Sequence, residues 1–122
     1  MAYHFKIIDQ ELDILEVNFE EELTFKEIEK VIDDYFSKPH RNVLIDMREG
    51  NFGIISRGEM VRIIERFKDP SVDHARKSAV VAASDEDLGL LMLMRNIGKM
   101  EQIPTTYKIF KDREEAIEWL RS

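Results

Sequence analysis

One stretch of the sequence gathers side chains whose types and spacing could do chemistry. Asp46 closes a short apolar run, Arg48 follows it, and the eight residues 48–55 lead to Ser56-Arg57-Gly58 at the start of an amphipathic segment. A carboxylate and a guanidinium at a strand end, with a hydroxyl at the next helix start, can bind an anion or orient a polar partner. Ligands of open α/β sheets collect at this place, beyond the carboxyl ends of the strands.

The loop Arg48–Ile55 is long and contains glycine. The chain has five glycines, and three of them, Gly50, Gly53 and Gly58, lie within nine residues. A long glycine-bearing loop favours a functional role, and a flexible turn that crosses the sheet edge is the alternative. We therefore predict that binding involves Asp46, Arg48, Asn51, Phe52, Ser56, Arg57 and Gly58, adjoined by Ser84.

Nucleotide binding and catalysis fit the same stretch poorly. A P-loop needs Gly-x-x-x-x-Gly-Lys-Ser/Thr, but here the lysine is missing and Glu59 would repel phosphate. An enzyme that used Asp46, Arg48 and Ser56 would need a base beside Ser56, and the sequence supplies none. The chain has no cysteine, and no metal-ligand spacing connects its three histidines, which are His4, His40 and His74. We expect no catalytic residue, no metal and no cofactor.

Apolar periodicity predicts the elements that position this stretch. Strands are expected where apolar residues alternate or run continuously, and helices where they recur every three or four residues. Each predicted helix begins with a capping side chain that is followed three residues later by an acid. The predicted strands are Tyr3–Ile8, Leu12–Phe19, Asn42–Met47, Ser78–Ala83 and Thr106–Phe110. The predicted helices are Thr24–Ser37, Arg57–Lys68, Asp85–Met100 and Arg113–Arg121.

The resulting order, ββαβαβαβα, predicts one α/β domain over residues 1–122. Apolar strands separated by helices indicate a mostly parallel sheet that helices cover on both faces. The polar joint Asp9-Gln10-Glu11 predicts that the first two strands form an antiparallel hairpin at one edge. A length of 122 residues suits a single domain with its own core.

The predicted helix Asp85–Met100 is more apolar than one buried face requires. Its predicted core stripe consists of Leu90, Leu93, Met94 and Ile97. A helix that is apolar beyond one stripe must bury the extra face. The alternatives are neighbouring core, an interface with a partner or a second copy, and the wall of an apolar ligand pocket. We assign this interface or pocket to Leu88, Leu91, Met92 and Met94.

The element order and two stretches carry a resemblance to a known family. The stretches are the Asn42–Met47 strand with the loop that ends in Ser56-Arg57-Gly58, and the closing segment Tyr107–Leu120. They resemble the STAS superfamily, and most of all its SpoIIAA-like branch of small stand-alone bacterial domains. The resemblance implies a non-enzymatic regulatory module that recognises a protein partner through the loop Arg48–Gly58 and the following helix.

The resemblance also bears on regulation and on a second function. STAS anti-sigma-factor antagonists are switched by phosphorylation in an Asp-Ser-Ser/Thr-Gly motif. Ile55 and Arg57 stand where that motif has its aspartate and its phospho-acceptor, which implies that the switch is lost and that Ser56 is a helix cap. Some members of the branch also resemble lipid-binding Sec14-type domains. The alternative function is therefore a carrier of a small apolar or lipid-like ligand between the sheet and the helices.

The formal charge of −7 is unevenly distributed along the chain. Residues 9–34 contain eleven acids and two lysines, whereas residues 35–77, with the candidate loop, contain nine bases and six acids. An acidic side and a mildly basic side could steer a charged partner or orient two copies in a homodimer. The overall charge argues against nucleic-acid binding, and no apolar run reaches the ~20 residues of a spanning helix. We therefore expect a cytoplasmic protein that binds a protein partner or a small apolar ligand.

Overall fold

The computed structural model describes residues 3–36, 42–50, 52–53, 55–66, 77–82, 84–100 and 107–122, except for the side chains of residues 35 and 36. The strands are β1 (Tyr3–Asp9), β2 (Ile14–Phe19), β3 (Asn42–Met47), β4 (Ser78–Ala82) and β5 (Tyr107–Phe110). The helices are α1 (Phe25–Phe36), α2 (Arg57–Glu65), α3 (Asp85–Met100) and α4 (Arg113–Arg121). The predicted order of elements is confirmed.

The five strands lie side by side in the order in which they occur in the chain. β1 pairs with β2 in antiparallel orientation, and each later strand pairs with the one before it in parallel orientation. Parallel neighbours require a crossover, and the helices α1, α2 and α3 lie in these connections. The predicted mixed sheet with an antiparallel edge hairpin is therefore confirmed.

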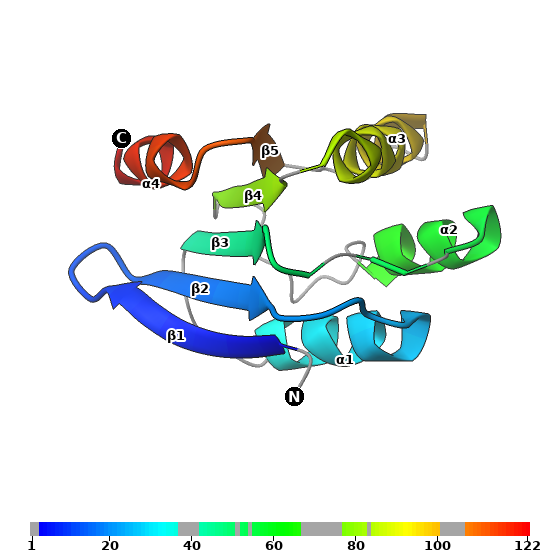
Figure 1. Cartoon of the computed structure of the whole chain (residues 1–122), viewed down its shortest axis with the longest axis horizontal. Coiled ribbons are helices and arrows are strands. Elements are labelled where there is room, and N and C mark those ends of the chain that lie inside the picture. The colour runs from blue at the N-terminus through cyan, green and yellow to red at the C-terminus, as the bar shows by residue number, and fades with distance from the viewer. Residues whose placement is uncertain are drawn as a thin grey trace.

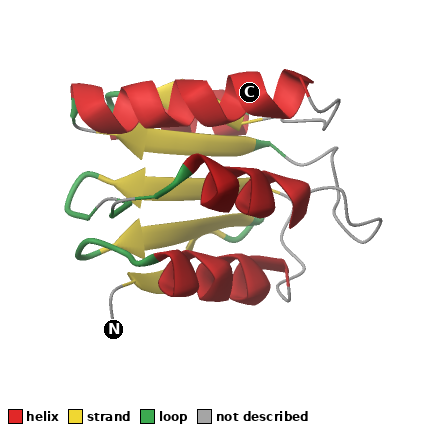
Figure 2. Ribbon diagram, turned by 90° about the vertical axis from the view of Figure 1, so that its right-hand side faces the viewer, coloured by secondary structure: helices red, strands yellow, loops and turns green. Residues whose placement is uncertain are grey.

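The helices are unequally divided between the two faces of the sheet. The residues of α1, α2 and α3 share one core with alternate residues of β2, such as Leu15 and Val17 (Figure 2). On the other side, α4 packs against β3, β4 and β5 and shares a smaller core with Leu44 and Val81 (Figure 1). The prediction of helices on both faces is confirmed, with a single described helix, α4, on the second face.

Side chains at the helix starts supply the expected caps. Thr24 with Glu27, and Ser56 with Glu59, form reciprocal hydrogen bonds between side chain and backbone at the starts of α1 and α2. The Ser84 hydroxyl accepts the Asp87 N–H at 3.1 Å in α3. These bonds satisfy backbone groups that a helix end leaves unpaired.

At the start of α4 the cap differs from the prediction. The Asp112 carboxylate accepts the N–H of Glu114 at 2.9 Å, one residue earlier than the predicted partner Glu115. An N-cap side chain can satisfy the N–H of either the second or the third helical residue, and the short aspartate here takes the nearer one.

The β1–β2 hairpin turns later than predicted, and β2 begins at Ile14 instead of Leu12. The Asp9 carboxylate accepts the N–H of Leu12 at 3.0 Å, and Asp13 has a φ of 55°. Aspartate closes such local turns and tolerates the left-handed region better than most residues. β1 therefore extends to Asp9, and the turn ends at Asp13, directly before β2.

The predicted core stripe of α3 is partly wrong. Leu93 is 43% exposed, whereas Leu91, which was predicted to lie outside the stripe, is 4% exposed and belongs to the core. The buried apolar residues of α3 are Leu91, Met94 and Ile97, which follow the spacing of three residues. The apolar composition of this helix fitted two overlapping stripes, and its contacts with α2 and β4 select this one.

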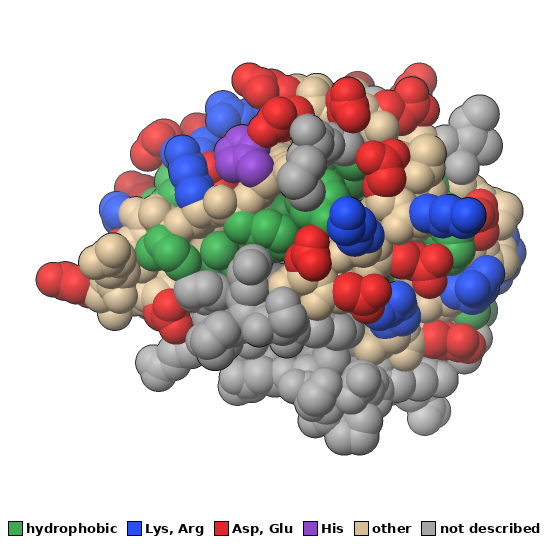
Figure 3. Space-filling model, turned by 90° about the horizontal axis from the view of Figure 1, so that it is seen from below, with side chains coloured by type: hydrophobic (Ala, Val, Ile, Leu, Met, Phe, Trp, Pro, Cys, Tyr) green, Lys and Arg blue, Asp and Glu red, His purple; other side chains and the backbone are tan. Residues whose placement is uncertain are grey.

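Some predictions lie outside the described residues. Among them are Asn51, His40, His74 and the predicted ends of the helices at Ser37 and Lys68. Within the described ranges, none of the helices is long and apolar enough to cross a membrane. Figure 3 looks onto the side of β1 and α1, where acidic side chains are interspersed with Lys and Arg side chains around a stretch of hydrophobic ones.

Candidate functional site

The loop that follows β3 is fastened to the loop that follows β2. Leu23 and Phe52 form an isolated parallel bridge, and the N–H of Gly53 donates to the Leu23 carbonyl at 2.8 Å. A Cβ at Gly50 would lie 2.5 Å from the backbone oxygen of Glu21. Because such a contact is impossible without movement, glycine at position 50 lets the two backbones approach closely.

The turn Ser56–Gly58 lies exposed at the end of this fastened loop. The Ser56 hydroxyl accepts the Glu59 N–H at 3.1 Å, and the Glu59 carboxylate accepts the Ser56 N–H at 3.0 Å. These contacts are those of a helix cap, in agreement with the predicted role of Ser56. Phe52, which is half-buried, packs edge-on against Phe19 with ring centroids 5.7 Å apart. The loop thus places a fixed, solvent-exposed turn at the start of α2.

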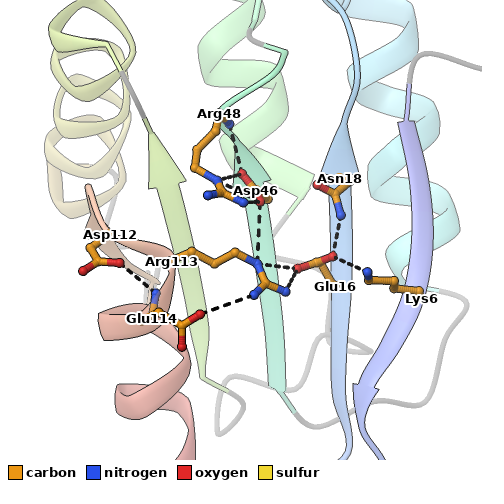
Figure 4. A pocket seen from close by; sticks show the side chains of 8 residues that line it. All are labelled: Lys6, Glu16, Asn18, Asp46, Arg48, Asp112, Arg113 and Glu114. Carbon is orange, nitrogen blue, oxygen red and sulfur yellow. Dashed lines mark hydrogen bonds and ion pairs between the residues drawn. The ribbon is translucent and has the colours of Figure 1, made fainter.

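Asp46 and Arg48 belong to a different place, a polar cleft on the α4 side of the sheet (Figure 4). Asp46 follows Leu44 by two residues, so its side chain leaves β3 on the face that Leu44 presents to α4. The cleft has a volume of about 440 Å³. Its lining consists of Lys6, Glu16, Asn18, Asp46, Arg48, Asp112, Arg113 and Glu114.

Two buried carboxylates form the floor of the cleft. Glu16 is 1% exposed and Asp46 is 3% exposed, and Arg113 lies between them. The Arg113 Nε donates to Glu16 Oε2 at 3.0 Å and lies 3.8 Å from Asp46 Oδ2. The remaining oxygen of Glu16 accepts the Asn18 amide and lies 3.6 Å from the ammonium of Lys6. The floor is therefore a closed network of ion pairs.

Arg48 completes the network at the end of β3. Its Nη2 donates to Asp46 Oδ2 at 2.8 Å, and its Nε and backbone N–H each donate to Asp46 Oδ1 at 3.0 Å. Burial acts to raise the pKa of Asp46, but the hydrogen bonds from Arg48 and the charges of Arg48 and Arg113 together hold this pKa below its usual value. The bond to Asp46 raises the pKa of Arg48. Both groups are therefore charged at neutral pH.

The structure divides the predicted site residues into separate groups. Asp46 and Arg48 lie in the cleft, while Phe52, Ser56, Arg57 and Gly58 belong to the loop and turn on the side of α2. Ser84 caps α3, which packs beside α2. Of the predicted apolar set, Leu91 and Met94 are buried in the core, Leu88 packs against it, and Met92 is 57% exposed.

Glu16 and Arg113, which form the centre of the cleft, were not predicted from the sequence. A usable signal was present, because Glu16 stands between apolar neighbours in β2, as Asp46 does in β3. A charge inside an apolar strand that proves to be central in its sheet must find a partner. The partner, Arg113, is 97 residues away from Glu16, so local spacing could not reveal it. Among the described residues, no group of three His, Asp or Glu side chains could hold a metal ion.

A sheet with strands in chain order, an antiparallel first pair and helices in these positions is the fold of the SpoIIAA-like class. An uncharacterized protein of the DUF3478 family from Shewanella loihica PV-4, which has a SpoIIAA-like fold, matches with a TM-score of 0.58 and 15% identity, over 98% of this chain and 92% of that chain. The phosphorylated form of the Bacillus cell fate determinant SpoIIAA matches with a TM-score of 0.53 and 14% identity, over 98% of this chain and all of that chain. No curated protein matches the sequence. The SpoIIAA-like family model matches residues 14–121, and the chain belongs to this family. The resemblance to the STAS superfamily is confirmed.

Proposed function

We propose that this chain is a non-enzymatic regulatory module that recognises a protein partner through the loop Arg48–Gly58 and the first turn of α2. The observation that carries this proposal is the exposed turn Ser56–Gly58 on a loop whose backbone is fastened at Leu23, Phe52 and Gly53. A surface held in one conformation loses little conformational entropy when it binds. This preorganisation favours recognition of a macromolecule by the turn.

Arg57 is the side chain of the turn best suited to make the contact. It is exposed on the first residue of α2, and arginine is enriched among residues that dominate binding energy at interfaces. The surrounding segment 35–77 has nine bases and six acids. A partner with an acidic contact surface is therefore favoured electrostatically.

Arg57 also bears on regulation. It occupies the position that corresponds to a phospho-acceptor in switched STAS domains, and arginine lacks the hydroxyl that accepts the phosphoryl group of such a switch. Ser56 is exposed, but its hydroxyl is committed to the cap of α2. We therefore propose that partner binding is constitutive with respect to phosphorylation at this turn.

The alternative, a carrier of an apolar or lipid-like ligand, draws no support from the cleft. All eight residues that line it are polar or charged. Apolar ligands bind in pockets lined mainly by hydrophobic and aromatic side chains. An enzyme at Ser56 is likewise unsupported, because the hydroxyl faces the cap of α2 and no activating base is among its contacts in the described part of the chain.

Site-specific photocrosslinking tests the proposal. A photoreactive amino acid replaces Arg57, and the matched control carries it at Glu118, an exposed residue of α4 on the other side of the sheet. After irradiation in cells of the source species, we expect a discrete protein adduct for position 57 alone. Equal adducts at both positions, or none at position 57, would refute the assignment. An adduct whose mass is twice that of the chain would identify the partner as a second copy.

A further inference from the structure

We propose that the polar cleft binds a small zwitterion, a molecule with one carboxylate and one ammonium group such as an α-amino acid. The cleft lies on the α4 side of the sheet, away from the turn assigned to partner recognition, so the proposal does not depend on that function. Figure 4 shows Asp112 and Glu114 on the α4 side and Lys6 on the β1 side, with Glu16 and Arg113 between them. The carboxylates of Asp112 and Glu114 thus lie on one side of the cleft and the ammonium of Lys6 lies on the other, while the carboxylates of the floor between them are already paired.

The basic part of the cleft has hydrogen-bond donors to spare. Arg48 donates hydrogen bonds to Asp46 from its Nε, its Nη2 and its backbone N–H, and its Nη1 has no acceptor among the described residues. Lys6 is exposed, and its ammonium lies 3.6 Å from Glu16, farther than a good hydrogen bond. A ligand carboxylate could accept from both cations, since each is an ionic donor that forms strong charge-assisted bonds.

The floor cannot serve as the acceptor for the ligand's ammonium group. Both Glu16 oxygens accept hydrogen bonds, from Arg113 and Asn18, and both Asp46 oxygens accept from Arg48. A carboxylate with its oxygens so engaged gains little from a further donor, which would have to displace one of these bonds. The floor therefore fixes the geometry of the cleft instead of contacting the charged ends of the ligand.

The acceptors for the ammonium lie on the first turn of α4. Asp112 uses Oδ1 for the N–H of Glu114, which leaves its second oxygen available in the described structure. Glu114 is exposed, and its closest cationic contact is to Arg113 at 4.0 Å. Together, Asp112 and Glu114 can face an ammonium from one side of the cleft while its carboxylate meets Lys6 and Arg48.

The charge balance and the size select this ligand class. Three of the lining residues are cationic and four are anionic, so the lining has a net charge of −1. A phosphate or a dicarboxylate would add two negative charges to a lining that is already negative, whereas a zwitterion adds none. A volume of about 440 Å³ falls in the range of small-molecule sites. Buried ion pairs often add no stability compared with apolar residues, which makes a positioning role for this floor the better physical account of its presence.

NMR titration of the full chain tests the proposal. The twenty standard amino acids are added one at a time, and the amide signals of Arg48, Asp112 and Glu114 are followed. Acetate, which has only the carboxylate, methylamine, which has only the ammonium, and inorganic phosphate, which is a dianion, are added separately as comparison ligands. We expect at least one amino acid to bind with a Kd of about 1 mM or tighter. Acetate and methylamine should bind at least about tenfold more weakly, because each loses one charge-assisted contact.

Matched variants assign the binding to the cleft. Lys6→Gln and Glu114→Gln remove exposed charges from its two sides, and Lys99→Gln and Glu115→Gln remove exposed charges outside it. The first pair should each weaken amino-acid binding by about fivefold or more, and the second pair should leave it unchanged. Failure of every amino acid to bind at about 1 mM, phosphate binding at least as tightly, or equal losses in the control pair would overturn the proposal.

Discussion

Replacing Arg113 with leucine should strongly destabilise the fold, because it removes the cation that Glu16 and Asp46 share. Loss of one partner from a buried ion pair costs about 3–5 kcal/mol. In this network Glu16 keeps the amide of Asn18, and Asp46 keeps its bonds to Arg48. The expected loss in the free energy of unfolding is therefore at the lower end of that range, about 3 kcal/mol.

Urea unfolding followed by circular dichroism measures this loss as a shift of the midpoint at constant slope. Arg121→Leu is the matched control, since Arg121 lies on the same helix and its Nε is 3.2 Å from Asp9, but it is exposed. Solvent screens such a pair, so the control should lose much less stability. Equal losses for the two variants would refute the reasoning.

The double variant Glu16→Leu/Arg113→Leu separates lost pairing from lost packing. If the penalty of Arg113→Leu comes from the unpaired Glu16 carboxylate, removing that carboxylate should restore part of the stability. A double variant that is as unstable as the sum of its two single variants would show that the side chains contribute independently. That outcome would contradict the description of the floor as a closed network.

Three further outcomes follow from single positions. Gly50→Ala should destabilise the fold, because the new Cβ would lie 2.5 Å from the backbone oxygen of Glu21. Gly89→Ala in α3 should stabilise the fold by up to about 1 kcal/mol, because its new Cβ would have no atom within 4 Å and alanine favours a helix. Thermal unfolding compares the two variants. Ser56→Ala should cost about 1 kcal/mol through the lost cap of α2, measured by urea unfolding, and a loss below a few tenths would contradict the cap. The pKa of Asp46 in the folded chain lies below its ordinary value of 3.8, so the stability that its charge contributes is present above pH 3.8 and is lost as the pH falls further. Between about pH 5 and pH 2, the free energy of unfolding should therefore fall less steeply for Asp46→Asn than for the unchanged chain, as measured by urea unfolding.

The fold could be predicted from the sequence because its evidence is local. Alternation in β2 separates Leu15 and Val17 from Glu16, and the capping pairs at Thr24 and Ser56 mark two helix starts within a few residues. Such patterns depend on residues that are close in sequence, so they can be recognised without knowledge of the tertiary structure. The α3 stripe was less predictable, because Leu91 and Leu93 are equally apolar and only packing distinguishes them.

The candidate sites depended on contacts that local patterns do not contain. The glycine-bearing loop after β3 favoured a functional role, with a flexible turn as the alternative, but Gly50 and Gly53 are explained by the approach of the β2–α1 loop. Asp46 and Arg48 were grouped with Ser56 because they are close in sequence, yet the alternation along β3 sends Asp46 to the opposite face. Only the assembled sheet shows that Asp46 and Glu16 face the same arginine.

The strand order also has a consequence for how the chain folds during synthesis. Each strand pairs with the strand made just before it, so the sheet can grow from the N-terminus as the chain emerges. The contacts of α4 are exceptions, since the pair of Glu16 and Arg113 spans 97 residues and the pair of Asp9 and Arg121 spans 112. Until α4 leaves the ribosome, Glu16 and Asp46 can be solvated by water but not paired with Arg113. We therefore expect the core on the side of α1, α2 and α3 to form first and the cleft to be completed only after α4 has been synthesised.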